Sequence, residues 1–367
     1  MPQGQAPPAG FFADTEIVGK EDHLRLHLNE NPYGPPPGTV DAVRAEAASH
    51  LNRYPDSECK ELRASLAAHF GVTPDMVAVG NGTDELVLVA SMAFLREPGA
   101  TVVTTATTFP GYVVSAAAVG ARAHTVPLRD ASIPVDGVVD GMERGAGLAF
   151  VCNPLNPTGA VLDRAAVTEL IDAAERTGTV LVFDEAYMDF AGPAHEFALD
   201  AVRAGRRVLV TRTFSKAWGL ASVRMGFAIG PQDLIRRIGA VAGALPFNVN
   251  RPAQRAVLRA LEQPEHIDRV RADNARAREL LCKSLDALGI EHAPSVSNFV
   301  MVKVPGEGAA PGDSVRFAAR LAAEHRIFVR NLDVLDLPGY LRISVGTVDE
   351  VERLATALAA LLGQARP

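Results

Sequence analysis

A lysine in an unusual setting, Lys216, is the first candidate for chemistry in this sequence. It stands between two apolar stretches of strand type, residues 207–210 and 225–230, whereas ordinary surface lysines are surrounded by polar residues. Its close neighbours in the sequence are Thr213, Ser215 and Trp218. One interpretation is a Schiff-base lysine that holds an aldehyde cofactor, with Arg224 neutralising the cofactor's phosphate. The other is a strand-end lysine in a salt bridge, and this stretch alone favours neither.

Further polar and aromatic residues occur where other strand-like segments end. They are the turn Gly82-Thr83-Asp84, then Phe109, Asn156, Asp184 and Tyr187, and finally Lys216 itself. In an open parallel sheet, ligands bind beyond the carboxyl ends of the strands. Because several independent loops bring such groups to one edge of the sheet, we expect them to share a single crevice.

The chemistry of these groups fits one cofactor, pyridoxal 5′-phosphate. A buried Asp184 needs a cation, and a protonated pyridine nitrogen would supply it while making the ring an electron sink. Asn156 and Tyr187 can hydrogen-bond a phenolic oxygen, and Phe109 can stack on the ring. Lys216 supplies the aldimine and, once displaced by substrate, an amine for proton transfer. The expected phosphate ligands are Gly82, Thr83, Asp84, Thr213, Ser215 and Arg224.

The hydrophobic pattern predicts the elements that position these groups. Strand-like and helical segments alternate from about residue 76 to 230, and each strand is continuous in hydrophobicity. This indicates an α/β fold with a mostly parallel sheet covered on both faces. From about residue 263 the pattern becomes α+β, with a long charged helix, three strands and a closing helix at 267–288, 298–303, 327–330, 341–344 and 348–362. We therefore expect an N-terminal tail and arm at 1–38, a large cofactor-binding domain at 39–265 and a small C-terminal domain at 266–367.

Composition narrows the function classes. The 367 residues are 48% hydrophobic and 22% charged, which is typical of a globular protein, and the net charge of −7 argues against nucleic acid as the main partner. The three cysteines, Cys59, Cys152 and Cys282, are widely spaced, which suggests reduced thiols in a cytoplasmic enzyme. The sequence offers no metal-ligand spacing, membrane-length apolar run or signal-peptide pattern, so we expect no metal and no membrane partner.

A set of motifs stands in one order along nearly the whole chain. The motifs are Leu28–Gly34, Tyr54–Asp56, Gly80–Glu85, Asn156–Gly159, Asp184–Tyr187, Ser215–Lys216 with Arg224, and Leu341–Gly346. Together they resemble the fold-type I pyridoxal-phosphate aminotransferases of the histidinol-phosphate aminotransferase group. The resemblance implies a seven-stranded, mostly parallel sheet sandwiched by helices and a small α+β domain. It also implies a homodimer with shared active sites, in which Tyr54 reaches the partner's cofactor phosphate.

The resemblance further implies a substrate class and the residues that bind it. The reaction would transfer an amino group between histidinol phosphate and 2-oxoglutarate or glutamate by a ping-pong mechanism. Arg342 would bind a substrate carboxylate with its planar guanidinium, and Arg330 would bind the substrate phosphate. Tyr33 would line the same pocket, and Asn29 would also contact substrate. The alternative for Arg330 is a strand-end arginine paired with Asp333 or Asp336.

Two departures from the family pattern keep other activities open. Phe109 stands where relatives often have tyrosine, and Ala221-Ser222 replaces the commoner Ala-Gly. The alternatives are an aromatic (phenylalanine-type) aminotransferase and a threonine-phosphate decarboxylase. A regulator that only senses pyridoxal phosphate would need a DNA-binding module of about 60–70 residues, for which the stretch before the first predicted core helix at 39 leaves too little room.

Overall fold

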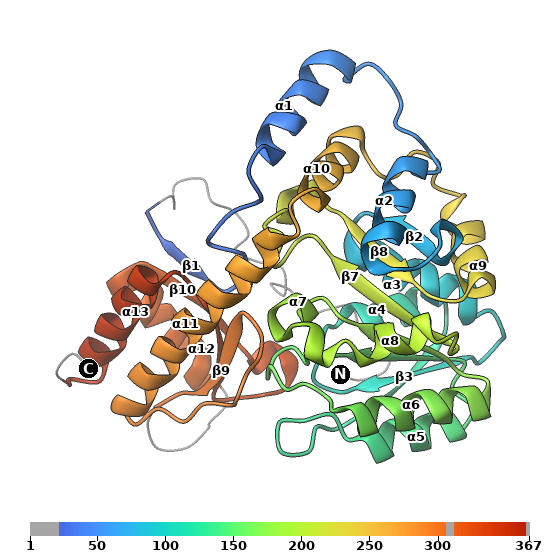
Figure 1. Cartoon of the computed structure of the whole chain (residues 1–367). Coiled ribbons are helices and arrows are strands. Elements are labelled where there is room, and N and C mark those ends of the chain that lie inside the picture. The colour runs from blue at the N-terminus through green and yellow to red at the C-terminus, as the bar shows by residue number, and fades with distance from the viewer. Residues whose placement is uncertain (1–21, 306–311, 365–367) are drawn as a thin grey trace.

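The computed structural model describes residues 22–305 and 312–364 of the chain (Figure 1). Residues 1–21, which include much of the predicted tail, lie outside the described residues. Two sheets organise the described part of the chain. The larger sheet has seven strands in the order β2-β8-β7-β6-β5-β3-β4, and the smaller has four in the order β1-β10-β11-β9.

The larger sheet is mostly parallel, as predicted. Its strands are β2 (Val77–Gly80), β3 (Thr101–Thr105), β4 (Arg122–Val126), β5 (Leu148–Cys152), β6 (Val180–Asp184), β7 (Val208–Thr213) and β8 (Gly226–Ile229). Strand β8 runs antiparallel to both of its neighbours, and the remaining pairs are parallel. Every residue of β5, β6 and β7 is buried, because helices cover both faces of the sheet.

Helices connect and cover these strands. They are α1 (Thr39–His50), α2 (Lys60–Phe70), α3 (Gly82–Phe94), α4 (Gly111–Ala118), α5 (Val135–Glu143), α6 (Arg164–Thr177), α7 (Met188–Ala191), α8 (Phe197–Arg203), α9 (Gln232–Ala242) and α10 (Arg251–Leu261). Helices α5, α6 and α8 pack in one row and α3 with α4 in another, and both rows contact the sheet (Figure 1). This arrangement confirms the predicted α/β class.

The smaller sheet joins the two ends of the described chain. Its strands are β1 (Leu24–Leu26), β9 (Phe299–Lys303), β10 (Ile327–Asn331) and β11 (Tyr340–Ser344). Strand β1 pairs in parallel with β10, although they are about 300 residues apart in sequence, and Leu24 and Leu26 lie in the core of this sheet. Helices α11 (Glu265–Ala287), α12 (Asp313–His325) and α13 (Val348–Leu361) accompany it, and the sequence pattern did not predict α12. The predicted domain boundaries stay a prediction.

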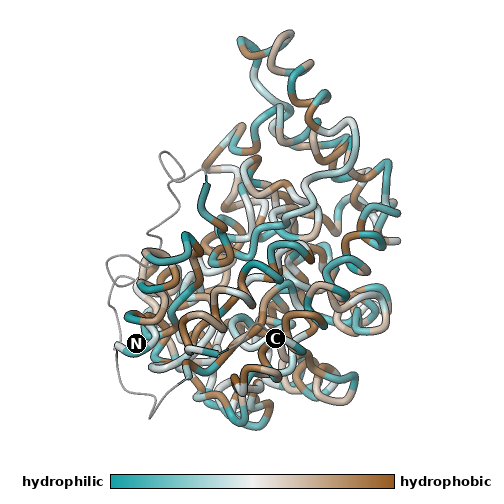
Figure 2. The backbone as a smooth tube through the Cα atoms, turned by 90° about the vertical axis from the view of Figure 1, so that its left-hand side faces the viewer, coloured by the Kyte–Doolittle hydropathy of each residue, from teal (hydrophilic) through white to brown (hydrophobic). Residues whose placement is uncertain are grey.

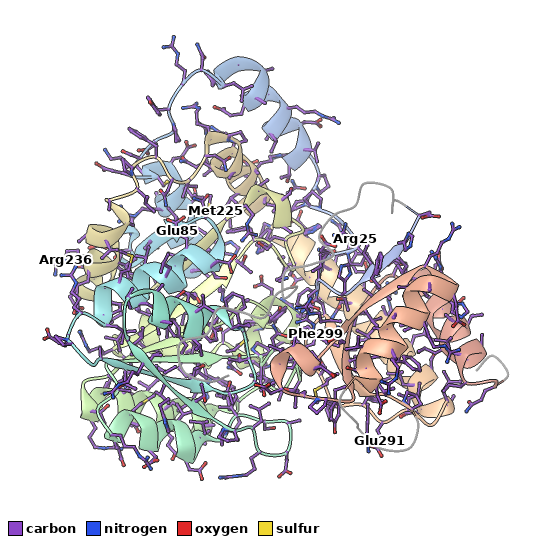
Figure 3. The ribbon with its side chains drawn as sticks, turned by 180° about the vertical axis from the view of Figure 1, so that it is seen from behind. Arg25, Glu85, Met225, Arg236, Glu291 and Phe299 are labelled. Carbon is purple, nitrogen blue, oxygen red and sulfur yellow. The ribbon has the colours of Figure 1, made fainter. Side chains whose placement is uncertain are left out.

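The core extends from the larger sheet toward the smaller one. Phe299 on β9 is fully buried, belongs to the core of the larger sheet and lies between the two parts in Figure 3. Helix α1, by contrast, projects from the body, and Figure 2 shows hydrophobic and hydrophilic residues mixed along it. Within the described ranges, no helix combines the length and apolarity that a membrane crossing needs, and no cluster of metal-binding side chains forms.

Candidate active site

A cavity of about 220 Å³ collects most of the predicted site residues. Those that line it are Asn29, Thr83, Asp84, Phe109, Asn156, Asp184, Tyr187, Thr213, Ser215, Lys216, Arg224, Arg330 and Arg342. They come from the carboxyl ends of strands in the larger sheet, from β10 and β11 of the smaller sheet, and from the segment that follows β1. The expectation that independent loops share one crevice is therefore correct.

Lys216 lies on the turn that follows β7, with its amine at the cavity. The Nζ atom donates a hydrogen bond of 3.1 Å to the carbonyl oxygen of Leu28. Burial, together with the positive charge of Arg342, lowers the pKa of the lysine to about 8. Near pH 8 a large share of this amine is therefore neutral, which is the form that attacks an aldehyde.

The turn that carries Lys216 is packed tightly against the N-terminal segment. Gly219 has a φ of +67°, and a Cβ atom there would lie 2.5 Å from the backbone of Gly34. Asn31 donates to the carbonyl oxygen of Ala217 over 2.7 Å. A side chain at position 219 would push the segment away, so glycine is required by both its conformation and its surroundings.

Asp184 ends β6 at the floor of the cavity. Its carboxylate accepts hydrogen bonds from the hydroxyl of Tyr112 at 2.6 Å, the hydroxyl of Thr211 at 3.3 Å and the amide of Ala186 at 3.3 Å. All three donors are neutral, and burial raises the pKa of Asp184 to about 6. A cation placed here would pair with a carboxylate that is already desolvated.

Tyr112 is a site residue that the sequence reasoning missed. Its ring is fully buried and stacks on Phe150 with 4.8 Å between ring centroids. The one signal that could have identified it is its place in the first turn of α4, three residues after Phe109. The ring of Phe109 approaches it edge-on at 5.4 Å.

The start of α3 and Arg224 form the expected phosphate end of the cavity. Gly82 begins the helix with a φ of +75°, and a Cβ atom there would lie 2.6 Å from the guanidinium of Arg224. Arg224 donates to Asp84 Oδ2 at 2.6 Å and to Ser215 Oγ at 3.3 Å. Unpaired amides at the helix start and this guanidinium form a positive end that suits a phosphate.

Two arginines on neighbouring strands of the smaller sheet also line the cavity. Arg330 on β10 is the register partner of Arg342 on β11. Arg342 donates to Asn156 Oδ1 at 2.6 Å and to the carbonyl oxygen of His27 at 2.9 Å, while its Nε is buried without a hydrogen-bond partner among the described residues. Burial and the charge of Arg330 lower the pKa of Arg342 to about 10, so it stays protonated at neutral pH.

Asn29 bridges the two sheets at the cavity wall. Its Nδ2 donates to the hydroxyl oxygen of Tyr187 at 3.1 Å, and its Oδ1 accepts from Ser344 at 2.9 Å. Its φ of 54° lies in the left-handed region, which asparagine tolerates better than most residues. Burial raises the pKa of Tyr187 to about 12, so its hydroxyl stays neutral. The predicted contact of Asn29 with substrate stays a prediction.

Three predicted site residues, Gly82, Tyr33 and Tyr54, are not among those that line the cavity within one chain. Burial raises the pKa of Tyr33 to about 12, with the carboxylates of Asp273 and Glu350 adding to the rise. Tyr54 is 78% exposed and stacks on Phe247 at 4.7 Å. Its predicted contact is with a partner's cofactor, so a single chain does not test it.

The described residues fit pyridoxal 5′-phosphate. They offer an amine of lowered pKa in Lys216, a buried carboxylate held only by neutral donors in Asp184, and a positive phosphate end at Arg224. These groups lie around one cavity, as a covalent cofactor with a ring nitrogen and a phosphate requires.

Comparison with known proteins identifies the family of this chain. A sequence profile of the family described as aminotransferase class I and II matches residues 21–358. Histidinol-phosphate aminotransferase 2 of Ralstonia nicotianae is 36% identical over 93% of this chain and 89% of its own length. The histidinol-phosphate aminotransferase of Moorella thermoacetica is 33% identical over 94% of this chain and 87% of its own length.

A solved structure extends the comparison to the fold. The histidinol-phosphate aminotransferase from Sinorhizobium meliloti in complex with pyridoxal-5′-phosphate superposes with a TM-score of 0.85 and 28% identity, covering 98% of this chain and 97% of its own. The fold class and the resemblance predicted from the sequence motifs are thereby confirmed. The chain belongs to the class I and II aminotransferase family.

Proposed function

We propose that this chain is a pyridoxal-phosphate aminotransferase that moves an amino group from histidinol phosphate to 2-oxoglutarate in two alternating half-reactions. The observation that carries the substrate class is the pair of arginines, Arg330 and Arg342, which are register partners on β10 and β11 and both line the cavity. Two guanidiniums suit a phosphate in one half-reaction and carboxylates in the other, because each can bind such a group through two hydrogen bonds. The names of the relatives support the same donor.

In this proposal, residues of the larger sheet hold the cofactor. Asp184 would pair with the pyridine nitrogen, Phe109 would stack on the ring, Asn156 and Tyr187 would hydrogen-bond its phenolic oxygen, and Arg224 with the start of α3 would hold the phosphate; all of these side chains line the cavity. When bound, the cofactor supplies a sink for the electrons released at the α-carbon of the amino donor.

The remaining work falls to protein groups at the cavity. Lys216, with a pKa of about 8, would take the proton from the donor's α-carbon on its Nζ and would then deliver it to the carbon that carries the cofactor's aldehyde. Arg342 and Arg330 orient the anionic end of the substrate, which keeps the reacting carbon near that amine. The bridge from Asn29 to Tyr187 keeps the segment after β1 closed over the site and limits the entry of water.

The proposal includes a homodimer in the cytoplasm. Helix α1 projects from the body and packs against α10 (Figure 1). Exposed apolar side chains occur on α1, just after it and in the stretch before α10, and they are Val40, Leu51, Tyr54, Leu245 and Phe247. A second copy of the chain would cover them and bring a partner's tyrosine near each cavity. The three cysteines are free, as expected in a reducing compartment.

A panel of amino donors tests the proposed function. The purified holoenzyme would be assayed with 2-oxoglutarate and histidinol phosphate, phenylalanine or threonine phosphate, with glutamate formation and carbon dioxide release measured. We expect kcat/KM for histidinol phosphate to exceed that for phenylalanine by at least about a hundredfold, because a phosphate bound by two arginines is worth several charge-assisted hydrogen bonds. A preference for phenylalanine, or carbon dioxide release from threonine phosphate, would contradict it.

A further inference from the structure

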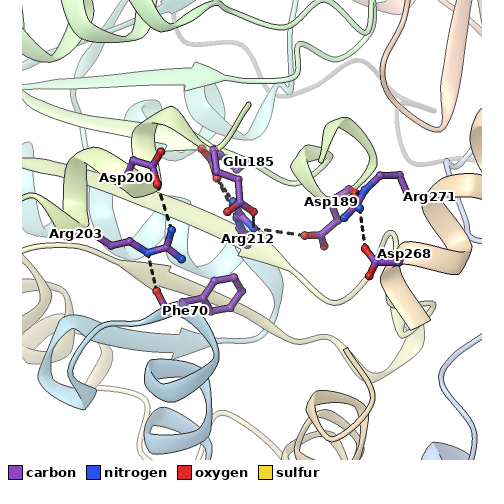
Figure 4. Close-up of polar contacts among 9 residues, drawn as sticks. Phe70, Glu185, Asp189, Asp200, Arg203, Arg212, Asp268 and Arg271 are labelled. Carbon is purple, nitrogen blue, oxygen red and sulfur yellow. Dashed lines mark hydrogen bonds and ion pairs between the residues drawn. The ribbon is translucent and has the colours of Figure 1, made fainter. Parts of the chain in front are cut away.

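The residues at the end of β6 and just after it divide between the cavity and the opposite side of the sheet. Asp184 and Tyr187 line the cavity. Glu185 and Asp189 direct their carboxylates to Arg212, which lies on β7 behind the site (Figure 4). Thr211, the residue before Arg212 on β7, is the register partner of Asp184 and donates a hydrogen bond to its carboxylate. Because successive side chains of a strand point to opposite faces, Thr211 lies on the face of Asp184 and Arg212 lies on the other face.

Arg212 is almost fully enclosed and binds several acidic groups at once. It is 3% exposed, and its Nε and Nη2 donate to the same oxygen of Glu185 at 2.9 and 2.7 Å. Its Nη1 donates to Glu196 at 2.9 Å and lies 3.5 Å from Asp189. The guanidinium also sits 5.3 Å from the ring centre of Phe70. Because the guanidinium is planar and is contacted by all of these groups, it fixes the positions of the three carboxylates relative to one another.

The acidic residues around Arg212 depend on its positive charge to offset the cost of their burial. Glu185 is fully buried, and one of its carboxylate oxygens has no hydrogen-bond partner among the described residues. Burial raises the pKa of Glu185 to about 7, and the charge of Arg212 opposes that rise. Asp189 and Glu196 add further negative charge, so the cluster holds more carboxylates than cations.

The same cluster reaches the lysine turn and the long helix α11. The indole of Trp218, two residues after Lys216, lies near the Asp189 carboxylate and opposes the rise that burial causes in its pKa. On the other side, Arg271 of α11 donates to the backbone carbonyl of Asp189 at 2.8 Å (Figure 4). A displacement of Asp189 would therefore shift its contacts with the turn that carries Lys216 and with α11, the helix that leads to the smaller sheet.

We propose that Arg212 is a positioning residue that fixes residues 184–189 against β7, so that Asp184 and Tyr187 stay in register with Lys216. The inference rests on the proposed function only in taking Asp184 as the partner of the cofactor ring. Arg212 itself does not line the cavity, and acts through the segment it holds.

The test replaces Arg212 by lysine in the holoenzyme. Arg212→Lys keeps the charge, but a single ammonium cannot reproduce the forked contact with Glu185 while also reaching Glu196 and Asp189. Arg206→Lys is the matched control, because Arg206 also binds two carboxylates, Asp172 and Glu175, but lies before β7 at the far end of the strand. The readouts are the pH midpoint of the bound cofactor's absorbance, kcat and KM with the amino donor, and the melting temperature.

If Arg212 positions Asp184, its lysine variant shifts the absorbance midpoint by about half a pH unit or more and lowers kcat about tenfold with little change in KM. The Arg206 control keeps both values. An unchanged midpoint and kcat in Arg212→Lys, with or without a lower melting temperature, overturns the proposal, because a merely structural residue would change stability alone.

A second variant covers the case in which Arg212→Lys does not fold. Glu185→Gln keeps the shape of the side chain and removes its charge, which loosens the contact with Arg212 without leaving an unpaired buried carboxylate. Glu185→Gln should shift the pH midpoint of the cofactor's absorbance in the same direction as Arg212→Lys, but by less. If both this midpoint and kcat equal those of the parent, the proposal is overturned. A parent protein that neither binds pyridoxal phosphate nor shows its absorbance would instead contradict the proposed function, so the two failures are distinguishable.

Discussion

The hydroxyl of Tyr112 donates a hydrogen bond of 2.6 Å to Oδ2 of Asp184. Both side chains are buried, and Tyr112 is further fixed by its stacking on Phe150. Burial raises the pKa of Asp184 to about 6, and the bond from Tyr112 opposes that rise. The tyrosine thus helps to keep the carboxylate ionised, which is the state that attracts a protonated ring nitrogen.

Tyr112→Phe should weaken cofactor binding on the acidic side of neutrality. Without the hydroxyl, the pKa of Asp184 in the cofactor-free protein rises further, so the carboxylate is protonated at a higher pH. Titration of the cofactor-free protein with pyridoxal phosphate between pH 5 and 8 would show the acidic loss of affinity moving to higher pH. Tyr340→Phe, on β11 and outside the cavity, should leave the curve in place. Two superimposable curves would contradict the prediction.

Asp184→Asn should abolish most turnover yet stabilise the cofactor-free protein above pH 6. The pKa of Asp184 is about 6 in the fold and 3.8 ordinarily, so the folded state binds more protons between these values. The free energy of unfolding of the cofactor-free protein therefore falls as pH rises from 3.8 to about 6. Above pH 6 the buried carboxylate is ionised and destabilises the fold by its full amount. Removing the charge should raise the free energy of unfolding at pH 8 by at most roughly 3 kcal/mol, with little change near pH 4. Urea unfolding of the variant and the parent at pH 8 and pH 4 measures this difference. A variant that is less stable than the parent at pH 8 would contradict the prediction.

Lys216→Ala should remove the covalent attachment of the cofactor. After borohydride reduction, mass spectrometry should find the cofactor on the parent chain and on Lys303→Ala, in which an exposed lysine paired with Glu291 is lost, but not on Lys216→Ala. Turnover should fall by at least about a hundredfold, because proton transfer by the amine is lost as well. Retained attachment in Lys216→Ala would show that another amine carries the cofactor.

The rate of cofactor capture should report the lowered pKa of Lys216. Burial and Arg342 lower this pKa from 10.5 to about 8, so the reactive neutral amine increases as pH rises and is largely formed above pH 8. Stopped-flow mixing of the cofactor-free protein with pyridoxal phosphate should give a rate that rises with pH to a midpoint near 8. Arg342→Gln should move the midpoint upward, because a neighbouring positive charge is removed. A midpoint near that of a solvent-exposed lysine would rule out the lowered pKa.

Arg330→Ala should discriminate between donors. We expect kcat/KM for histidinol phosphate to fall by roughly 10–100-fold, the value of one or two charge-assisted hydrogen bonds, and that for phenylalanine to change by less than about threefold. Arg326→Ala removes an exposed arginine next to the start of the same strand and serves as the control. Equal losses on both donors would remove the basis for a phosphate contact at Arg330.

The sequence by itself determined the buried strands of the larger sheet and most residues of the site. Continuous apolar segments predicted the buried strands β5, β6 and β7, because a strand covered on both faces has no need of polar alternation. Motifs at strand ends predicted that Lys216, Asp184 and Asn156 would meet, because parallel strands place their carboxyl ends at one edge. These are local patterns, and a linear sequence displays them directly.

The tertiary structure alone decided which distant residues touch. Tyr112 and Asp184 are 72 residues apart, Asn29 and Tyr187 are 158 apart, and β1 pairs with β10 across almost the whole chain. Such pairings depend on a strand order that does not follow the sequence, and on packing that no local pattern encodes. The lowered pKa of Lys216 and the enclosure of Arg212 likewise arise from neighbours brought in from several elements, because desolvation depends on the complete fold.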